Sequence, residues 1–189
     1  MPKLRQQQGA DVTFLQPDNR DPLTGAVTEA ALIRFVEAVL EISDGQGPAV
    51  GLLRVAVDGL PDIAAELGCP TAEAVLLGTA DRLHENVRNQ DLVGRVGAGF
   101  GICMPDLLPA EARRVAERLR RTLAGAPLPT PGGALGITCS IGFALAFEST
   151  TRAATLLEAA CLALEAAQRS GGDCVMPAAG TEPSRQGSG

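Results

Sequence analysis

Residues 92–104 read LVGRVGAGFGICM, and the fold prediction depends on this stretch more than on any other. Two short apolar runs, Leu92–Val96 and Phe100–Met104, stand on either side of Gly97-Ala98-Gly99. Short runs rich in β-branched and large apolar residues, separated by a glycine-containing turn, are typical of two paired strands. The stretch therefore predicts a tight β-hairpin in the middle of the chain.

Helical and strand patterns alternate on both sides of this hairpin. Apolar residues that recur every third or fourth position predict amphipathic helices at residues 28–40, 71–88, 109–123 and 153–164. Apolar or alternating stretches predict strands at residues 50–57, 137–145 and 174–175. This order is typical of an α+β sandwich of the ferredoxin-like kind, with a sheet between helices.

The composition indicates one acidic globular domain. The 189 residues are 46% hydrophobic and carry a formal charge of −6, so we expect a sizeable core and no nucleic-acid or membrane partner. The cysteines form no C-x-x-C pair, and no stretch resembles a signal peptide or a membrane span, so we expect a cytoplasmic protein. We expect an arm or linker at residues 1–20, the domain at 21–177 and a disordered tail at 178–189.

Four short strings in the chain resemble, in their order and spacing, those of a known family. They are Asp21-Pro22-Leu23-Thr24-Gly25, Arg95-Val96-Gly97-Ala98-Gly99-Phe100, Ala116-Glu117-Arg118-Leu119-Arg120 and Ser140-Ile141-Gly142-Phe143-Ala144. Over residues 21–175 the chain resembles the GGDEF family, whose members are diguanylate cyclases. The resemblance implies a nucleotidyl-cyclase-like palm fold, with a central antiparallel sheet flanked by helices.

The same resemblance bears on catalysis. A diguanylate cyclase needs carboxylates that hold Mg²⁺ beside GTP, and the family's positions for them fall on Ala56 and on Gly97-Ala98-Gly99. The family's phosphate-binding lysine falls on Pro61. Asp58 remains, and we interpret it as a turn residue before Gly59. We therefore expect a degenerate member that is not an enzyme, with no catalytic residue, no metal site and no requirement for Mg²⁺.

A second family feature is retained in the chain. Arg88-Asn89-Gln90-Asp91 resembles the R-x-x-D inhibitory site at which many GGDEF domains bind cyclic di-GMP, with Arg118 as an assisting arginine and Arg95 expected nearby. Arginine can donate two hydrogen bonds to the O6 and N7 edge of guanine, and a carboxylate can accept from N1 and N2. We expect a cyclic di-GMP receptor that signals to a partner protein, and a homodimer where two copies share the ligand.

Three alternatives stay open. Arg88 and Asp91, three residues apart at the expected helix end, would equally suit an exposed salt bridge without a ligand. A second alternative is a scaffold that binds a partner protein without any nucleotide. A peptide of that partner would lie in an apolar groove lined by Leu60, Pro61 and Ala64. A working cyclase is the third alternative, and formation of cyclic di-GMP from GTP and Mg²⁺ would reveal it.

Overall fold

A five-stranded sheet organises the computed structural model, which describes residues 16–43, 49–147 and 151–181. The elements, in chain order, are η2 Pro17–Asn19, α2 Glu29–Ile42, β1 Ala49–Val57, α3 Leu60–Leu67, α4 Cys69–Asn86, β2 Leu92–Val96, β3 Gly99–Leu107, α5 Pro109–Ala124, β4 Leu128–Thr130, β5 Gly133–Leu135, β6 Cys139–Ala146, α6 Ala153–Arg169 and β7 Val175–Pro177. The predicted α+β fold is confirmed.

The sheet has the strand order β2-β3-β1-β6-β7. Strand β1 lies in the middle and pairs antiparallel with both β3 and β6. The predicted hairpin is confirmed, because β2 and β3 pair antiparallel and Gly97 takes a positive φ of 56° in their turn. Strand β7 runs parallel to β6, so the sheet is mixed rather than wholly antiparallel.

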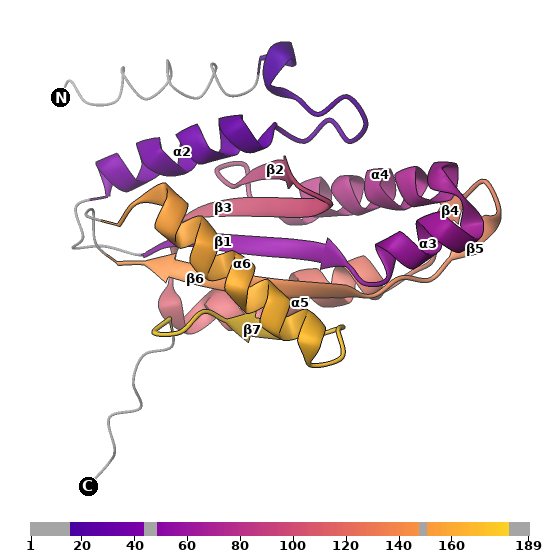
Figure 1. Ribbon diagram of the computed structural model, residues 1–189. Coiled ribbons are helices and arrows are strands. Elements are labelled where there is room, and N and C mark those ends of the chain that lie inside the picture. The colour runs from indigo at the N-terminus through magenta and orange to yellow at the C-terminus, as the bar shows by residue number, and fades with distance from the viewer. Residues whose placement is uncertain (1–15, 44–48, 148–150, 182–189) are drawn as a thin grey trace, which may run out of the picture.

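Helices cover both faces of the sheet (Figure 1). Alternate residues of β1 point to opposite faces, so Leu52 packs with α2 and α6 whereas Leu53 packs with α3, α4 and α5. On the α6 face, a Cβ at Gly142 would lie 2.0 Å from the backbone nitrogen of Leu164. Glycine is therefore required where β6 and α6 touch, and this contact fixes how the helix lies on the sheet.

Two features of the structure were not predicted. Helix α3 begins at Leu60 with Pro61 in its first turn, a position at which proline is favourable because the missing amide would be unpaired in any case. Strands β4 and β5 form a separate small hairpin.

Helix α4 ends at Asn86, two residues earlier than predicted, so Arg88 follows the helix rather than lying in it.

The ends of the described chain pack onto the domain. Arg20 and Val27 form an isolated bridge, and Val27 pairs with Gly94 of β2. Ala178 and Thr181 are buried, although they fall within the predicted tail, and residues 182–189 lie outside the described residues. Among residues 16–43, 49–147 and 151–181, no helix combines the length and the apolar character that crossing a bilayer requires.

Candidate functional site

The R-x-x-D residues form a closed turn between α4 and β2. The backbone N–H of Arg88 donates to Oδ2 of Asp91 at 2.9 Å, and the backbone N–H of Asp91 donates to the carbonyl of Arg88 at 3.0 Å. The side chain of Gln90 reaches the carbonyl of Pro105 on β3 at 3.4 Å. These bonds hold the turn in one shape, so its side chains are presented from a fixed backbone.

Asp91 is half-buried in this turn, and burial raises the pKa of its carboxyl. The hydrogen bond from the Arg88 amide and the charges of Arg88 and Arg118 lower the same pKa and oppose the burial effect only in part. A carboxylate with one oxygen bonded to an amide retains acceptor capacity on its other oxygen.

Arg118 lies on α5 beside the same turn. Its Nη2 donates to the carbonyl of Asn86, the last residue of α4, at 3.2 Å. Because its charge acts on the Asp91 carboxyl, Arg88, Asp91 and Arg118 lie within electrostatic reach of one another. The structure thus gathers three of the four residues singled out in the sequence, from two elements far apart in the chain.

Arg95, the fourth of these residues, lies apart from them at the other end of β2. It is four positions along the chain from Asp91, which corresponds to about 13 Å in an extended strand. Its Nη1 donates to the carbonyl of Gly99 at 2.7 Å, and its guanidinium lies 5.4 Å from the centre of the Phe100 ring. These contacts tie Arg95 to the β2–β3 hairpin.

The structure does not form the salt bridge that was the alternative reading of the R-x-x-D turn. Both Arg88 and Arg118 are exposed, and no ion pair in the described part of the chain involves either guanidinium. The bond between Arg88 and Asp91 is made by the backbone amide instead. Most donors of the two guanidiniums therefore face solvent beside a half-buried carboxylate.

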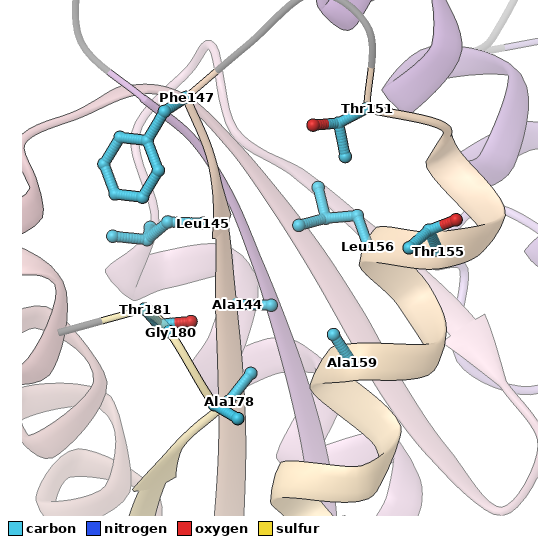
Figure 2. Close-up of a pocket in the computed structure, with 11 residues that line it drawn as sticks. Ala144, Leu145, Phe147, Thr151, Thr155, Leu156, Ala159, Ala178, Gly180 and Thr181 are labelled. Carbon is cyan, nitrogen blue, oxygen red and sulfur yellow. The ribbon is translucent and has the colours of Figure 1, made fainter.

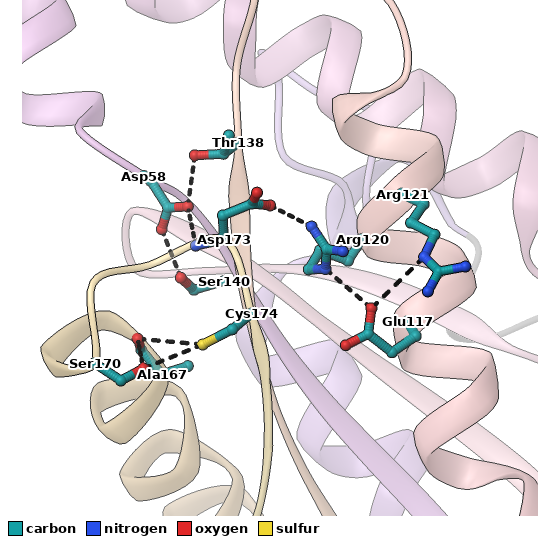
Figure 3. A network of polar contacts seen from close by, with 10 residues as sticks. All are labelled: Asp58, Glu117, Arg120, Arg121, Thr138, Ser140, Ala167, Ser170, Asp173 and Cys174. Carbon is teal, nitrogen blue, oxygen red and sulfur yellow. Dashed lines mark hydrogen bonds and ion pairs between the residues drawn. The ribbon is translucent and has the colours of Figure 1, made fainter.

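A second polar cluster lies at the end of β1 (Figure 3). The sequence had led us to expect that the family's metal and GTP ligands are missing from this end of the strand. The Asp58 carboxylate accepts from the hydroxyl of Thr138 at 2.8 Å, the hydroxyl of Ser140 at 2.6 Å and the backbone N–H of Asp173 at 2.9 Å. Asp58 thus joins β1, β6 and the loop before β7, a role that its interpretation as a turn residue did not include.

Asp173 and Arg120 extend this cluster to α5, and sequence reasoning missed both. Asp173 takes a positive φ of 47° and forms an ion pair with Arg120, which also pairs with Glu117 at 3.0 Å. Gly171-Gly172 before Asp173 signals a turn, but no local pattern reveals a partner in another element. We call Asp58, Thr138, Ser140, Asp173 and Arg120 the carboxylate clasp.

The residues named for an apolar groove along α3 differ in exposure. Leu60 is buried, Ala64 is half-buried against the core, and Pro61 is exposed. A hollow of about 150 Å³ lies instead between the far end of β6 and α6, around Phe147 and Leu156 (Figure 2). Among the described residues, those that line it are uncharged.

Comparison with known proteins identifies the family. The family profile described as diguanylate cyclase, GGDEF domain, matches residues 18–174. The diguanylate cyclase DgcP of Pseudomonas aeruginosa is 32% identical over 154 residues, which cover 81% of this chain and 23% of that protein. The response regulator PleD of Caulobacter vibrioides is 34% identical over 143 residues, 74% of this chain and 32% of PleD. The chain thus spans about a quarter to a third of the length of these relatives.

Solved structures agree in fold. Diguanylate cyclase SiaD of Pseudomonas aeruginosa, in complex with its activator SiaC, matches with a TM-score of 0.80 and 26% identity over 92% of this chain and 67% of SiaD. The GGDEF domain of DgcB from Caulobacter crescentus, in complex with cyclic di-GMP, matches with a TM-score of 0.79 and 19% identity over 86% of this chain and 94% of that one.

The expectation that the chain is not an enzyme is wrong, because its relatives and its matching family are named as diguanylate cyclases. That expectation was drawn from single positions of the motif rather than from the whole chain. The structure places Asp173 beside Asp58 through its backbone N–H, while the Asp173 carboxylate pairs with Arg120 on α5. The match over residues 18–174 shows that the chain belongs to the GGDEF domain family of diguanylate cyclases.

Proposed function

We propose that this GGDEF domain binds cyclic di-GMP at the Arg88–Asp91 turn with the help of Arg118, and that binding signals to a partner protein. One observation carries the proposal: two exposed guanidiniums without an ion pair in the described part of the chain stand beside a half-buried carboxylate. Arginine can contact phosphate oxygens or a guanine edge with two hydrogen bonds at once, so these two guanidiniums are suited to an anionic ligand that carries guanine.

The chemistry of the turn matches both edges of guanine. The Arg88 guanidinium can donate to O6 and N7, and the Asp91 oxygens can accept from N1–H and N2–H of a base. Arg118 on α5, whose charge acts on Asp91, supplies charge for a phosphate or stacks on a second base. Cyclic di-GMP carries two guanines and two phosphates, so one ligand can use all three side chains.

Two neighbours in structure support the proposal without deciding it. The GGDEF domain of DgcB was solved in complex with cyclic di-GMP, and SiaD was solved with an activator protein. By analogy, a domain of this fold can bind both a dinucleotide and a protein. Because Arg88 and Arg118 are exposed, a ligand bound there can also contact a second copy of the domain, and we propose a ligand-dependent homodimer.

Equilibrium dialysis with labelled cyclic di-GMP tests the proposal, and cyclic di-AMP is the matched control ligand. Both ligands have the same charge and backbone, but adenine presents an N6 donor where guanine presents O6, and it lacks the N1–H and N2–H donors. We expect cyclic di-AMP to bind at least about tenfold more weakly, since one bidentate base contact is worth about 1–3 kcal/mol.

Two outcomes would overturn the proposal. Equal binding of the two ligands would mean that only the phosphates are recognised. No binding of cyclic di-GMP, together with nucleotide-independent association with a partner, would favour the scaffold alternative. Sedimentation of the protein with and without ligand measures the homodimer separately.

A further inference from the structure

The second half of helix α2 presents an exposed outer face among the described residues. Val36 and Leu40 are buried against the sheet, whereas Glu37, Glu41 and Ile42 are exposed. Ile42 is 66% exposed, the largest fraction of any large apolar side chain that the structure describes. One exposed apolar residue is ordinary on a protein surface, so what this face can bind depends on the side chains around it.

This outer face is negatively charged. Glu37 and Glu41 are four residues apart, so their carboxylates are neighbours on the helix surface and repel each other. No ion pair in the described part of the chain involves either of them. The last turn of α2 contains no basic residue, although the carbonyl end of a helix favours positive charge. A cationic partner would therefore relieve the repulsion and complement the end of the helix.

Apolar side chains lie beside the two carboxylates. Ala38 and Ile42 are likewise four residues apart, and we call them the apolar strip of α2. Val39 next to the strip is only half-buried against the core. A partner suited to this face therefore carries positive charge together with apolar side chains.

The first fifteen residues of the chain have this character. They lie outside the described residues, and their sequence is MPKLRQQQGADVTFL. They contain two basic residues and one acidic residue, whereas the chain as a whole is acidic. The basic residues are Lys3 and Arg5, and the large apolar residues that accompany them are Leu4, Val12, Phe14 and Leu15.

The described chain begins close to α2, so these residues are tethered near its surface. The Nη2 of Arg34 donates to Oδ1 of Asn19 at 2.9 Å, and the backbone N–H of Thr28, the N-cap of α2, donates to the carbonyl of Asn19 at 2.7 Å. Even at the 1.5 Å rise per residue of a helix, fifteen residues span about 22 Å, and the 14 residues of α2 span about 21 Å. Residues 1–15 are therefore long enough to reach Ile42.

We propose that the outer face of α2 is the docking surface of residues 1–15 of the same chain. Lys3 and Arg5 lie against Glu37 and Glu41, and the apolar side chains of the segment cover the apolar strip. A short tether gives such a segment an effective concentration on the order of 1 mM, so weak contacts are enough to hold it. The surface includes no residue of the turn proposed to bind cyclic di-GMP, so the two proposals are tested separately.

A charge-swap experiment on the full chain tests this docking, with amide hydrogen exchange in the last turn of α2 as the readout. Lys3→Glu with Arg5→Glu should speed this exchange at least about threefold, because two attractive pairs become repulsive. In a background with Glu37→Lys and Glu41→Lys, the same reversal of Lys3 and Arg5 should slow the exchange. Each comparison is made within one background, so effects of the α2 substitutions on the helix itself cancel.

Glu66→Lys with Glu73→Lys is the matched control background, because both acids are exposed and lie on α3 and α4. There the reversal of Lys3 and Arg5 should speed exchange as it does in the unchanged protein. If that reversal left the exchange unchanged, or shifted it in the same direction in both α2 backgrounds, the proposal would be overturned. Exchange that slowed as the protein concentration rose would assign the surface to a second copy, and would equally overturn it.

Discussion

The Arg88–Asp91 turn and the carboxylate clasp contain the same kinds of side chain and use them in opposite ways. In the clasp, Asp58 accepts three hydrogen bonds and Asp173 pairs with Arg120, so the charged groups are occupied within the domain. In the turn, one carboxylate oxygen accepts a backbone amide while the guanidiniums of Arg88 and Arg118 form no ion pair in the described part of the chain. Occupied polar groups stabilise a fold, whereas available ones can bind a ligand. Substitutions in the clasp should therefore change stability, and substitutions in the turn should change binding.

The largest effect is expected from Asp58→Ala in the clasp. It removes one carboxylate that accepts from three donors in two segments, which should lower the free energy of unfolding by about 3 kcal/mol. For a domain of this size the melting temperature should fall by about 6–12 °C. Calorimetry of the variant beside Glu66→Ala, an exposed acid on α3, measures the difference. The distinction between the two regions would be wrong if Asp58→Ala weakened cyclic di-GMP binding by more than its loss of stability explains.

Arg88→Ala should produce the converse result. Loss of a charged, bidentate contact should weaken cyclic di-GMP binding by about 10- to 100-fold, since such a bond contributes about 1.5–3 kcal/mol. The melting temperature of the free protein should stay within about 2 °C, because no hydrogen bond or ion pair of the described residues involves the Arg88 side chain. Arg169→Ala, an exposed arginine on α6, is the matched control in isothermal titration. Undiminished binding by Arg88→Ala would remove this residue from the site.

Arg118→Ala should have a smaller effect on the same titration. One N–H of Arg118 already donates to the carbonyl of Asn86. We also expect Arg118 to contact a phosphate or to stack on a base, rather than to form hydrogen bonds with the edge of a base. We expect about three- to tenfold weaker binding, consistent with about 1 kcal/mol for one partly exposed charged contact. A larger loss of affinity for Arg118→Ala than for Arg88→Ala would mean that Arg118, and not Arg88, makes the stronger contact with the ligand.

The smallest effect near neutral pH is expected from titration of Asp91. Folding raises the pKa of this carboxyl, so protonation of Asp91 contributes stability at low pH that is lost as the pH rises through its folded-state pKa. Guanine binding needs the ionised carboxylate, so affinity should be constant at neutral pH and fall below the raised pKa, earlier than for an ordinary aspartate. Affinity measured against pH should be flat for Asp91→Asn. A flat profile for the unchanged protein would exclude Asp91 as an acceptor for the base.

The sequence was most informative where structure is local. The hairpin at residues 92–104 and the short β2 strand Leu92–Val96 follow from neighbouring residues, and both are confirmed. Helix α3 was missed because Pro61 interrupts an apolar pattern, although proline is favourable in a first turn. Arg88, Asp91 and Arg118 could be named from a family motif, but their closeness depends on α4 and α5 packing together.

Long-range contacts account for the rest of what the sequence did not reveal. Asp58 bonds to residues 80, 82 and 115 positions later in the chain, and no period or motif connects such positions. Arg54 stands in an apolar strand and attracted no notice, because the carbonyls that bind it belong to another hairpin. The expectation about the enzyme class was wrong for a different reason, because it was drawn from single positions, whereas the family match covers residues 18–174.

Backbone amide shifts measured by NMR during titration with cyclic di-GMP test the central claim most directly. We expect saturable shifts at Arg88–Asp91 and at Arg118, with the signals of the clasp residues Asp58, Ser140 and Asp173 unchanged. Saturable shifts confined to the clasp and the end of β1, with an unchanged Arg88–Asp91 turn, would contradict it.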